Sequence, residues 1–117
     1  MTDRAAIEAR LEAIAAGLPD VRAERSGGEV SWSAEGHAFA VLTDDAVELR
    51  LSAPVAAAAA NTPDTEPSVR GVGWVRFMPA ALDAHAIDRL EAWFAFARRH
   101  AAEGAQPAAP RGGKGAN

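Results

Sequence analysis

Apolar residues recur along this chain with two different spacings, and the spacing separates helices from strands. Four residues near the start have the three- and four-residue steps of a helix face: Ile7, Leu11, Ile14 and Leu18. They predict a helix over residues 3–16. A similar apolar stripe lies near the other end: Ile87, Leu90, Phe94 and Ala97. It predicts a long helix that begins after Asp83, whose carboxylate suits an N-cap.

Between these helices, apolar and polar residues alternate in short segments that end at turn residues. The predicted strands are residues 21–25, 29–34, 37–43, 46–51 and 74–78. Alternation over such short runs is typical of strands with one buried face. Gly27 and Gly28 separate the first two segments and predict a hairpin. The clearest case places Val47, Leu49 and Leu51 inward.

A short alanine-rich helix is predicted over residues 54–60, because proline suits a first turn and alanine favours helices. The loop 62–73 follows it. Since short turns join most strands, we expect a mainly antiparallel sheet of four to five strands. The N-terminal and C-terminal helices each have one apolar stripe, so we expect both on one face, in a two-layer α+β domain.

The large aromatic residues predict where the core lies. They are Trp32, Phe39, Phe77, Trp93, Phe94 and Phe96. Few other large residues are present, so these side chains indicate a core rather than a cofactor box. The segment 104–117 has no periodicity, and we expect a disordered tail after a single domain over residues 1–103.

Charge and cysteine content narrow the classes of function. The chain has a net charge of −4, and residues 104–117 hold Arg111, Lys114 and no acid, so the body carries −6. An acidic body argues against general affinity for nucleic acid. The absence of cysteine excludes disulfides and thiolate sites. No signal peptide or membrane-spanning run is present, so we expect a cytoplasmic protein with no membrane partner.

Several segments together resemble a known group of small proteins. They are His37-Ala-Phe-Ala-Val-Leu, Val47-Glu-Leu-Arg-Leu, Thr62-Pro-Asp-Thr, Gly73-Trp-Val-Arg-Phe and the helix from Asp83 to Phe94. This pattern is similar to small actinobacterial "luciferase family" or "luciferase domain" proteins, over roughly residues 30–102. The strand meander, the Gly-Trp-Val strand and the closing helix also resemble MmcQ/YjbR-like proteins. Neither resemblance implies a role for any particular residue.

The sheet face turned away from the helices, here called the open face, is the candidate site. If Val75 and Phe77 face inward, the open face holds polar and aromatic side chains: Glu48, Arg50, Trp74 and Arg76. The loop 62–73 would overhang them with Thr62, Ser68 and Arg70. Guanidinium groups bind carboxylate or phosphate in a bidentate way, which predicts a site for a small anionic ligand. The alternative is a solvated face with surface ion pairs.

Two further interpretations apply to the same region. An exposed Trp beside Arg is typical of an interface anchor, so the open face also predicts a homodimer surface. Thr62 and Asp64 have a purely structural interpretation, in which their side chains satisfy backbone groups of the loop.

No catalytic signature is present, and no GxSxG, Walker or GxGxxG pattern precedes a helix. Three histidines without a ligand-like spacing predict no metal site, and we expect no cofactor. We therefore favour a non-catalytic ligand-binding or protein-interaction module that uses the open face and loop 62–73. The alternatives are a small enzyme acting on an anionic metabolite at the same face, or a YjbR-like DNA-associated module.

Overall fold

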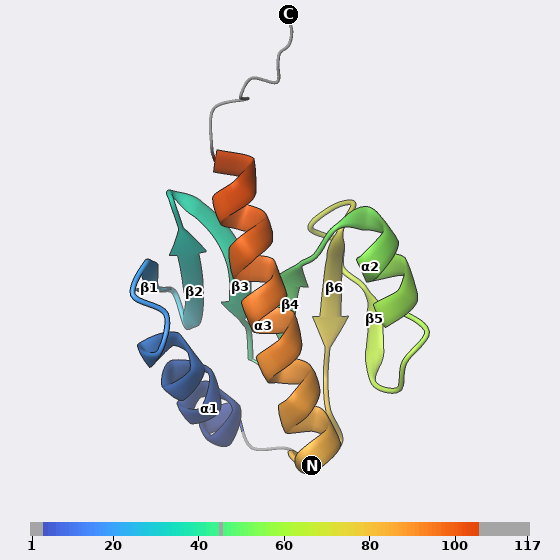
Figure 1. Ribbon diagram of the computed structural model, residues 1–117. Helices are drawn as coiled ribbons and strands as arrows, with labels where there is room; N and C mark the ends of the chain where they lie inside the picture. Colours follow the sequence, from blue (N-terminus) through green and yellow to red (C-terminus); the bar gives the residue numbers. More distant parts are fainter. Residues whose placement is uncertain (1–3, 45, 106–117) are drawn as a thin grey trace, which may run out of the picture.

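The computed structural model describes residues 4–44 and 46–105 (Figure 1). The elements in chain order are α1 (Arg4–Ala16), β1 (Val21–Ser26), β2 (Glu29–Ala34), β3 (His37–Leu42), β4 (Val47–Arg50), α2 (Ala53–Ala59), β5 (Thr65–Pro67), β6 (Trp74–Phe77) and α3 (Ala84–Ala105). The helix α3 continues beyond residue 103, where the sequence predicted the domain to end. The predicted tail from residue 106 lies outside the described residues.

One antiparallel sheet of six strands runs in the order β1-β2-β3-β4-β6-β5. The additional strand is β5, which lies inside the predicted loop 62–73. It pairs with β6 through Thr65 opposite Phe77 and Glu66 opposite Arg76. With three residues and a terminal proline, β5 carries no alternation that a sequence pattern can reveal.

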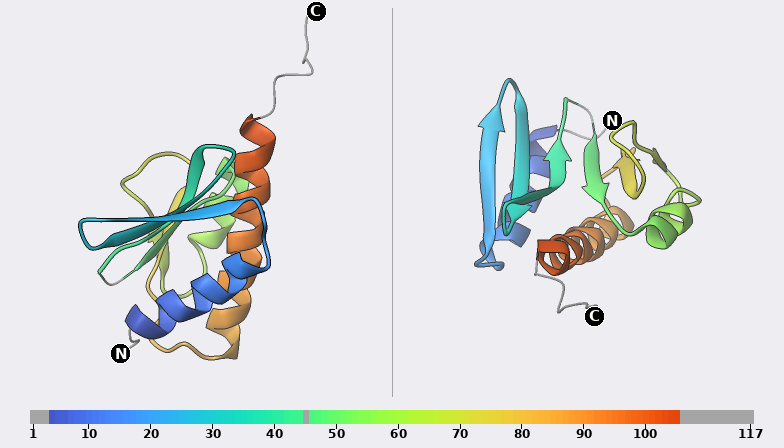
Figure 2. Two further views of the ribbon diagram at one scale, coloured as in Figure 1. Left: turned by 90° about the vertical axis from the view of Figure 1, so that its left-hand side faces the viewer. Right: turned by 90° about the horizontal axis from the view of Figure 1, so that it is seen from above.

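Helices cover one face of this sheet, as predicted for a two-layer α+β domain (Figures 1 and 2). The long helix α3 contacts β2, β3 and β4, and α1 packs beside α3. The α3 helix begins where Asp83 Oδ1 accepts a hydrogen bond from the Ala86 amide at 2.9 Å. At the start of α1, Arg4 donates to the carbonyls of Thr43 at 2.9 Å and Gly28 at 2.7 Å, which ties this helix to two turns of the sheet.

The core lies between the helices and the sheet, and most of the predicted aromatic residues fill it. Trp32, Phe39, Phe77 and Phe94 are fully buried. Phe94 meets both Phe39 and Trp32 edge-to-face, with ring centroids 5.0 and 5.9 Å apart. Trp93 and Phe96 are partly buried and pack against this core.

A register shift between β2 and β3 explains why Phe39 and Ala40 are both fully buried although they are neighbours. Trp32 lies opposite Ala40 and Ser33 lies opposite Ala38, so Phe39 is the extra residue of a β-bulge. A bulge interrupts the alternation of a strand. Both side chains therefore enter the core below α3.

Candidate functional site

The strand register lines up one row of residues across the open face. The row runs Glu24, Ser31, Val41, Glu48, Arg76 and Glu66, one residue from each strand. Glu48 and Arg76 are direct cross-strand partners near its centre. The predicted inward residues Val75 and Phe77 are buried, as are Val47, Leu49 and Leu51. The facing of both strands predicted from alternation is therefore confirmed.

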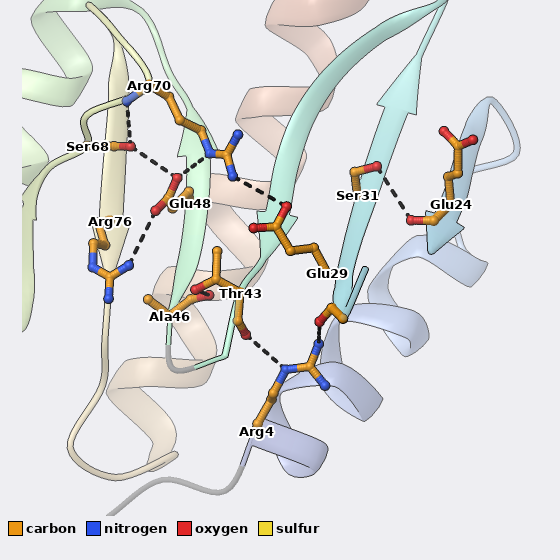
Figure 3. A network of polar contacts seen from close by, with 11 residues as sticks. Arg4, Glu24, Glu29, Ser31, Thr43, Ala46, Glu48, Ser68, Arg70 and Arg76 are labelled. Atoms are coloured by element: carbon orange, nitrogen blue, oxygen red, sulfur yellow. Dashed lines mark hydrogen bonds and ion pairs between the residues drawn. The ribbon is translucent and has the colours of Figure 1, made fainter. Parts of the chain in front are cut away.

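Glu48 is the centre of a polar cluster on this face (Figure 3). Only 5% of the residue is exposed, although it lies on the side of the sheet away from α3. Its Oε1 accepts hydrogen bonds from Ser68 Oγ at 3.1 Å and from Arg70 Nε, and its Oε2 accepts from Arg76 Nη1 at 3.3 Å. A buried carboxylate needs such partners to offset its lost hydration.

The two arginines of this cluster also contact further carboxylates. Arg70 Nη2 lies 3.8 Å from Glu29 Oε1, and Arg76 Nε lies 3.6 Å from Glu66 Oε2. The Arg70 guanidinium also lies 5.7 Å from the centroid of the Trp74 ring. Three carboxylates thus surround two guanidinium groups, so the positive charge of both arginines is balanced within the cluster, which carries a formal charge of −1.

Backbone hydrogen bonds hold loop 68–73 against the neighbouring strands. The Ser68 amide donates to the Trp74 carbonyl at 3.0 Å, and the Arg70 amide donates to Ser68 Oγ at 3.1 Å. The Leu51 amide donates to the Gly73 carbonyl at 2.6 Å. Gly73 has φ +88°, and a Cβ there would lie 2.6 Å from the Leu51 carbonyl oxygen. The close approach of this loop to the end of β4 therefore requires glycine.

Two valines of this loop point into solvent. Val69 is 101% exposed and Val72 is 88% exposed, and they are the exposed large apolar residues within the described ranges. Val72 also borders an apolar hollow of ≈ 180 Å³ between the loop and α2. Alanines of α2 form the opposite wall, including Ala53, Ala56 and Ala57. The loop therefore contacts two parts of the molecule: Arg70 reaches the open face, and Val72 borders the hollow beside α2.

Most of the predicted site residues lie together in the structure, whereas Arg50 and Thr62 lie outside the cluster. Glu48, Ser68, Arg70, Trp74 and Arg76 lie together. Arg50 is the cross-strand partner of Trp74, but it forms no ion pair with the residues that the structure describes. Thr62 contacts other groups: its Oγ1 donates to the Ala59 carbonyl at 2.7 Å and lies 3.0 Å from Thr65 Oγ1.

The structural interpretation of the loop applies to its first half. Thr62 Oγ1 satisfies a carbonyl at the end of α2, and Asp64 Oδ2 accepts from the Ala80 amide at 3.2 Å. The second half contains the residues that sequence reasoning missed, Val69 and Val72. A signal was present, because a β-branched apolar residue between loop-forming Ser, Arg and Gly residues has no strand face on which to be buried.

The chemistry of the cluster is that of a structural ion-pair network. Ser68 Oγ donates to the Glu48 carboxylate, which also accepts hydrogen bonds from Arg70 and Arg76. Within residues 4–44 and 46–105, no group of three or more His, Asp or Glu side chains is placed to hold a metal ion. None of the described helices combines the length and apolarity that a membrane-spanning segment needs.

Comparison of the chain with models of protein families, with curated proteins and with solved structures gives no match. The resemblance to luciferase-domain and YjbR-like proteins therefore stays a prediction.

Proposed function

We propose that the protein is a non-catalytic interaction module that binds an apolar segment of another protein with loop 68–73 and the hollow beside α2. The single observation that carries this proposal is the full exposure of Val69 and Val72 on a loop that the rest of the domain holds in place. Val72 borders the apolar hollow beside α2, and contiguous exposed apolar surface is typical of interaction sites.

The anchoring of the loop supports binding rather than chance exposure. Arg70 lies between the two valines in sequence, and its guanidinium is bound to the buried Glu48. Backbone hydrogen bonds from Ser68 and Leu51 hold the ends of the loop. A loop already ordered in the free protein loses little conformational entropy when a partner binds, which favours affinity.

The hollow beside α2 gives the partner a defined contact. Its volume of ≈ 180 Å³ is similar to that of a cavity of about 150 Å³ that holds one benzene molecule. Alanine, valine and tryptophan side chains line it. The hollow therefore suits a single apolar side chain, inserted while the backbone of the partner lies across Val69.

A small anionic ligand is a second candidate, and Arg50 is the observation that favours it. Arg70 and Arg76 are engaged by carboxylates of the protein, so an anion would have to displace Glu48, Glu29 or Glu66. Arg50 lies across the strand pair from Trp74 without an ion pair among the described residues. It is the guanidinium that an anion would engage first.

NMR titration with two probes separates the candidates. We expect indole, as a mimic of an apolar side chain, to shift the amide resonances of Val72 and Ala57, and Val72→Ser to weaken its binding. Val69→Ser is the matched control, because Val69 does not line the hollow. Phosphate shifts centred on Arg50, with none from indole, would support the anion instead.

Selection from a displayed peptide library then tests recognition of protein segments. We expect selected peptides to be rich in large apolar residues and to bind the Val69→Ser and Val72→Ser variants at least tenfold more weakly. The variant Arg50→Gln should bind them as well as the native protein. Peptides that bind all variants equally would contradict the proposal.

A further inference from the structure

The two edges of the sheet are built differently. The edge strand β5 has three residues, ends at Pro67 and is contacted by α2. The opposite edge strand β1 has six residues and contains no proline. Short edge strands and prolines are the usual means by which proteins prevent strand addition. The β5 edge is protected in this way and the β1 edge is not.

The β1 strand is also exposed in space. Residues 22–26 are all exposed, and only Val21 is half-buried. In the left view of Figure 2, β1 faces the viewer, α1 lies below it, and no described element covers its outer edge. The backbone groups on that side have no strand partner, so the edge is a template for another strand.

The charges of β1 are complementary to those of a second copy in one antiparallel register. Glu24 faces the open side of the sheet, because it lies in the row with Ser31 and Glu48, and Arg22 is two residues away on the same side. When the twofold axis passes through Ala23, Arg22 of each copy lies opposite Glu24 of the other. Opposite charges directly across a strand pair are stabilising.

The neighbouring registers are unfavourable. A twofold axis perpendicular to the sheet turns the same face of both copies to the same side. Residues directly opposite one another then have side chains on the same face, so the pairing register can change only in steps of two residues. An axis through Arg22 places that residue opposite its own copy, and an axis through Glu24 does the same for the glutamate. Like charges directly opposite one another are destabilising. In the register with the axis through Ala23, this residue lies opposite its own copy, and it has the smallest side chain of β1.

We propose that β1 pairs antiparallel with β1 of a second copy of this chain, about a twofold axis through Ala23, with reciprocal Arg22–Glu24 pairs. This pairing joins two sheets into one continuous sheet. It leaves loop 68–73 of both copies exposed at the far ends, so it does not depend on the proposed function. Its surface differs from the open-face dimer that the sequence predicted.

Charge reversal tests the register by sedimentation velocity of the full chain. We expect the native protein to shift from monomer to dimer as its concentration rises, while Arg22→Glu alone and Glu24→Arg alone stay monomeric. A mixture of the two single variants should form heterodimers, because glutamates of one copy then face arginines of the other. The double variant should regain the native dimer.

A cysteine placed on the proposed axis gives an independent measurement, because the chain has no cysteine of its own. Opposite residues of antiparallel strands have Cα atoms about 4.5–5.5 Å apart, within the range of a disulfide. We expect Ala23→Cys to cross-link rapidly on oxidation. Ser26→Cys, a control that keeps both Arg22–Glu24 pairs, should cross-link slowly because it lies away from the axis. A native protein that stays monomeric, or a dimer indifferent to charge reversal and to the position of the cysteine, would overturn the proposal.

Discussion

Replacement of Glu48 with alanine tests how loop 68–73 is held on the sheet. In the native protein this buried carboxylate accepts hydrogen bonds from Ser68, Arg70 and Arg76. The substitution removes the acceptor shared by all three donors. It leaves two guanidinium groups on the open face without this central carboxylate, while their contacts with Glu29 and Glu66 remain.

The magnitude follows from the burial of the partners. A hydrogen bond to a charged group contributes about 1.5–3 kcal/mol, and loss of one partner of a fully buried ion pair costs about 3–5 kcal/mol. The side chains of Arg76 and Arg70 are 25% and 33% exposed, so water replaces part of what they lose. We therefore expect Glu48→Ala to lower the free energy of unfolding by about 2–4 kcal/mol.

Urea denaturation followed by circular dichroism measures this change. With a denaturant slope of about 2 kcal/mol per molar, the midpoint should fall by roughly 1–2 M. The matched control is Glu66→Ala, because Glu66 contacts the same Arg76 from an exposed position and should change stability by about 0–1 kcal/mol. Trypsin should also cleave after Arg70 faster in Glu48→Ala. Equal stability losses in the two variants, with unchanged cleavage, would refute the reasoning.

Three further substitutions test the fold by the same urea assay. Phe94→Ala should lower the free energy of unfolding by about 3–5 kcal/mol, because it leaves a cavity among the buried aromatic rings. Gly73→Ala should cost about 1–3 kcal/mol, because the new Cβ meets the Leu51 carbonyl at a positive φ. Asp83→Ala should cost about 1 kcal/mol through loss of the α3 N-cap, whereas Asp88→Ala on the exposed helix surface should have little effect. An undiminished midpoint in any of the first three variants would contradict the contact assigned to it.

Much of the fold was predictable because its signals are local. Alternation in residues 46–51 and 74–78 gave the strands and their buried faces, and the apolar stripes gave both main helices. The bulge at Phe39 and the strand β5 were not predictable from these patterns. Both depend on pairing with a neighbouring strand, and neither leaves a repeated spacing in the sequence.

Most residues of the candidate site were predictable from the sequence, but the burial of Glu48 was not. Alternation placed Glu48 on the open face, yet the same rule implied an exposed side chain. Its burial comes from Ser68 and Arg70, which are 20 and 22 residues away in the chain. This arrangement also changes the choice of variants. Arg76 supports the stability of the domain, so Arg50 is the better residue for testing an anionic ligand without unfolding the protein.

The short strand β5 has a consequence for the size of any assembly. A sheet that accepted new strands at both edges would grow without limit into a filament. Here Pro67 and the three-residue length of β5 oppose growth on one side. Pairing through β1 uses the same surface on both copies, which closes the assembly at two. With the proposed β1 pairing, the proline that ends β5 would keep the assembly from growing further, and a longer β5 with a β-branched residue in place of Pro67 would favour fibres.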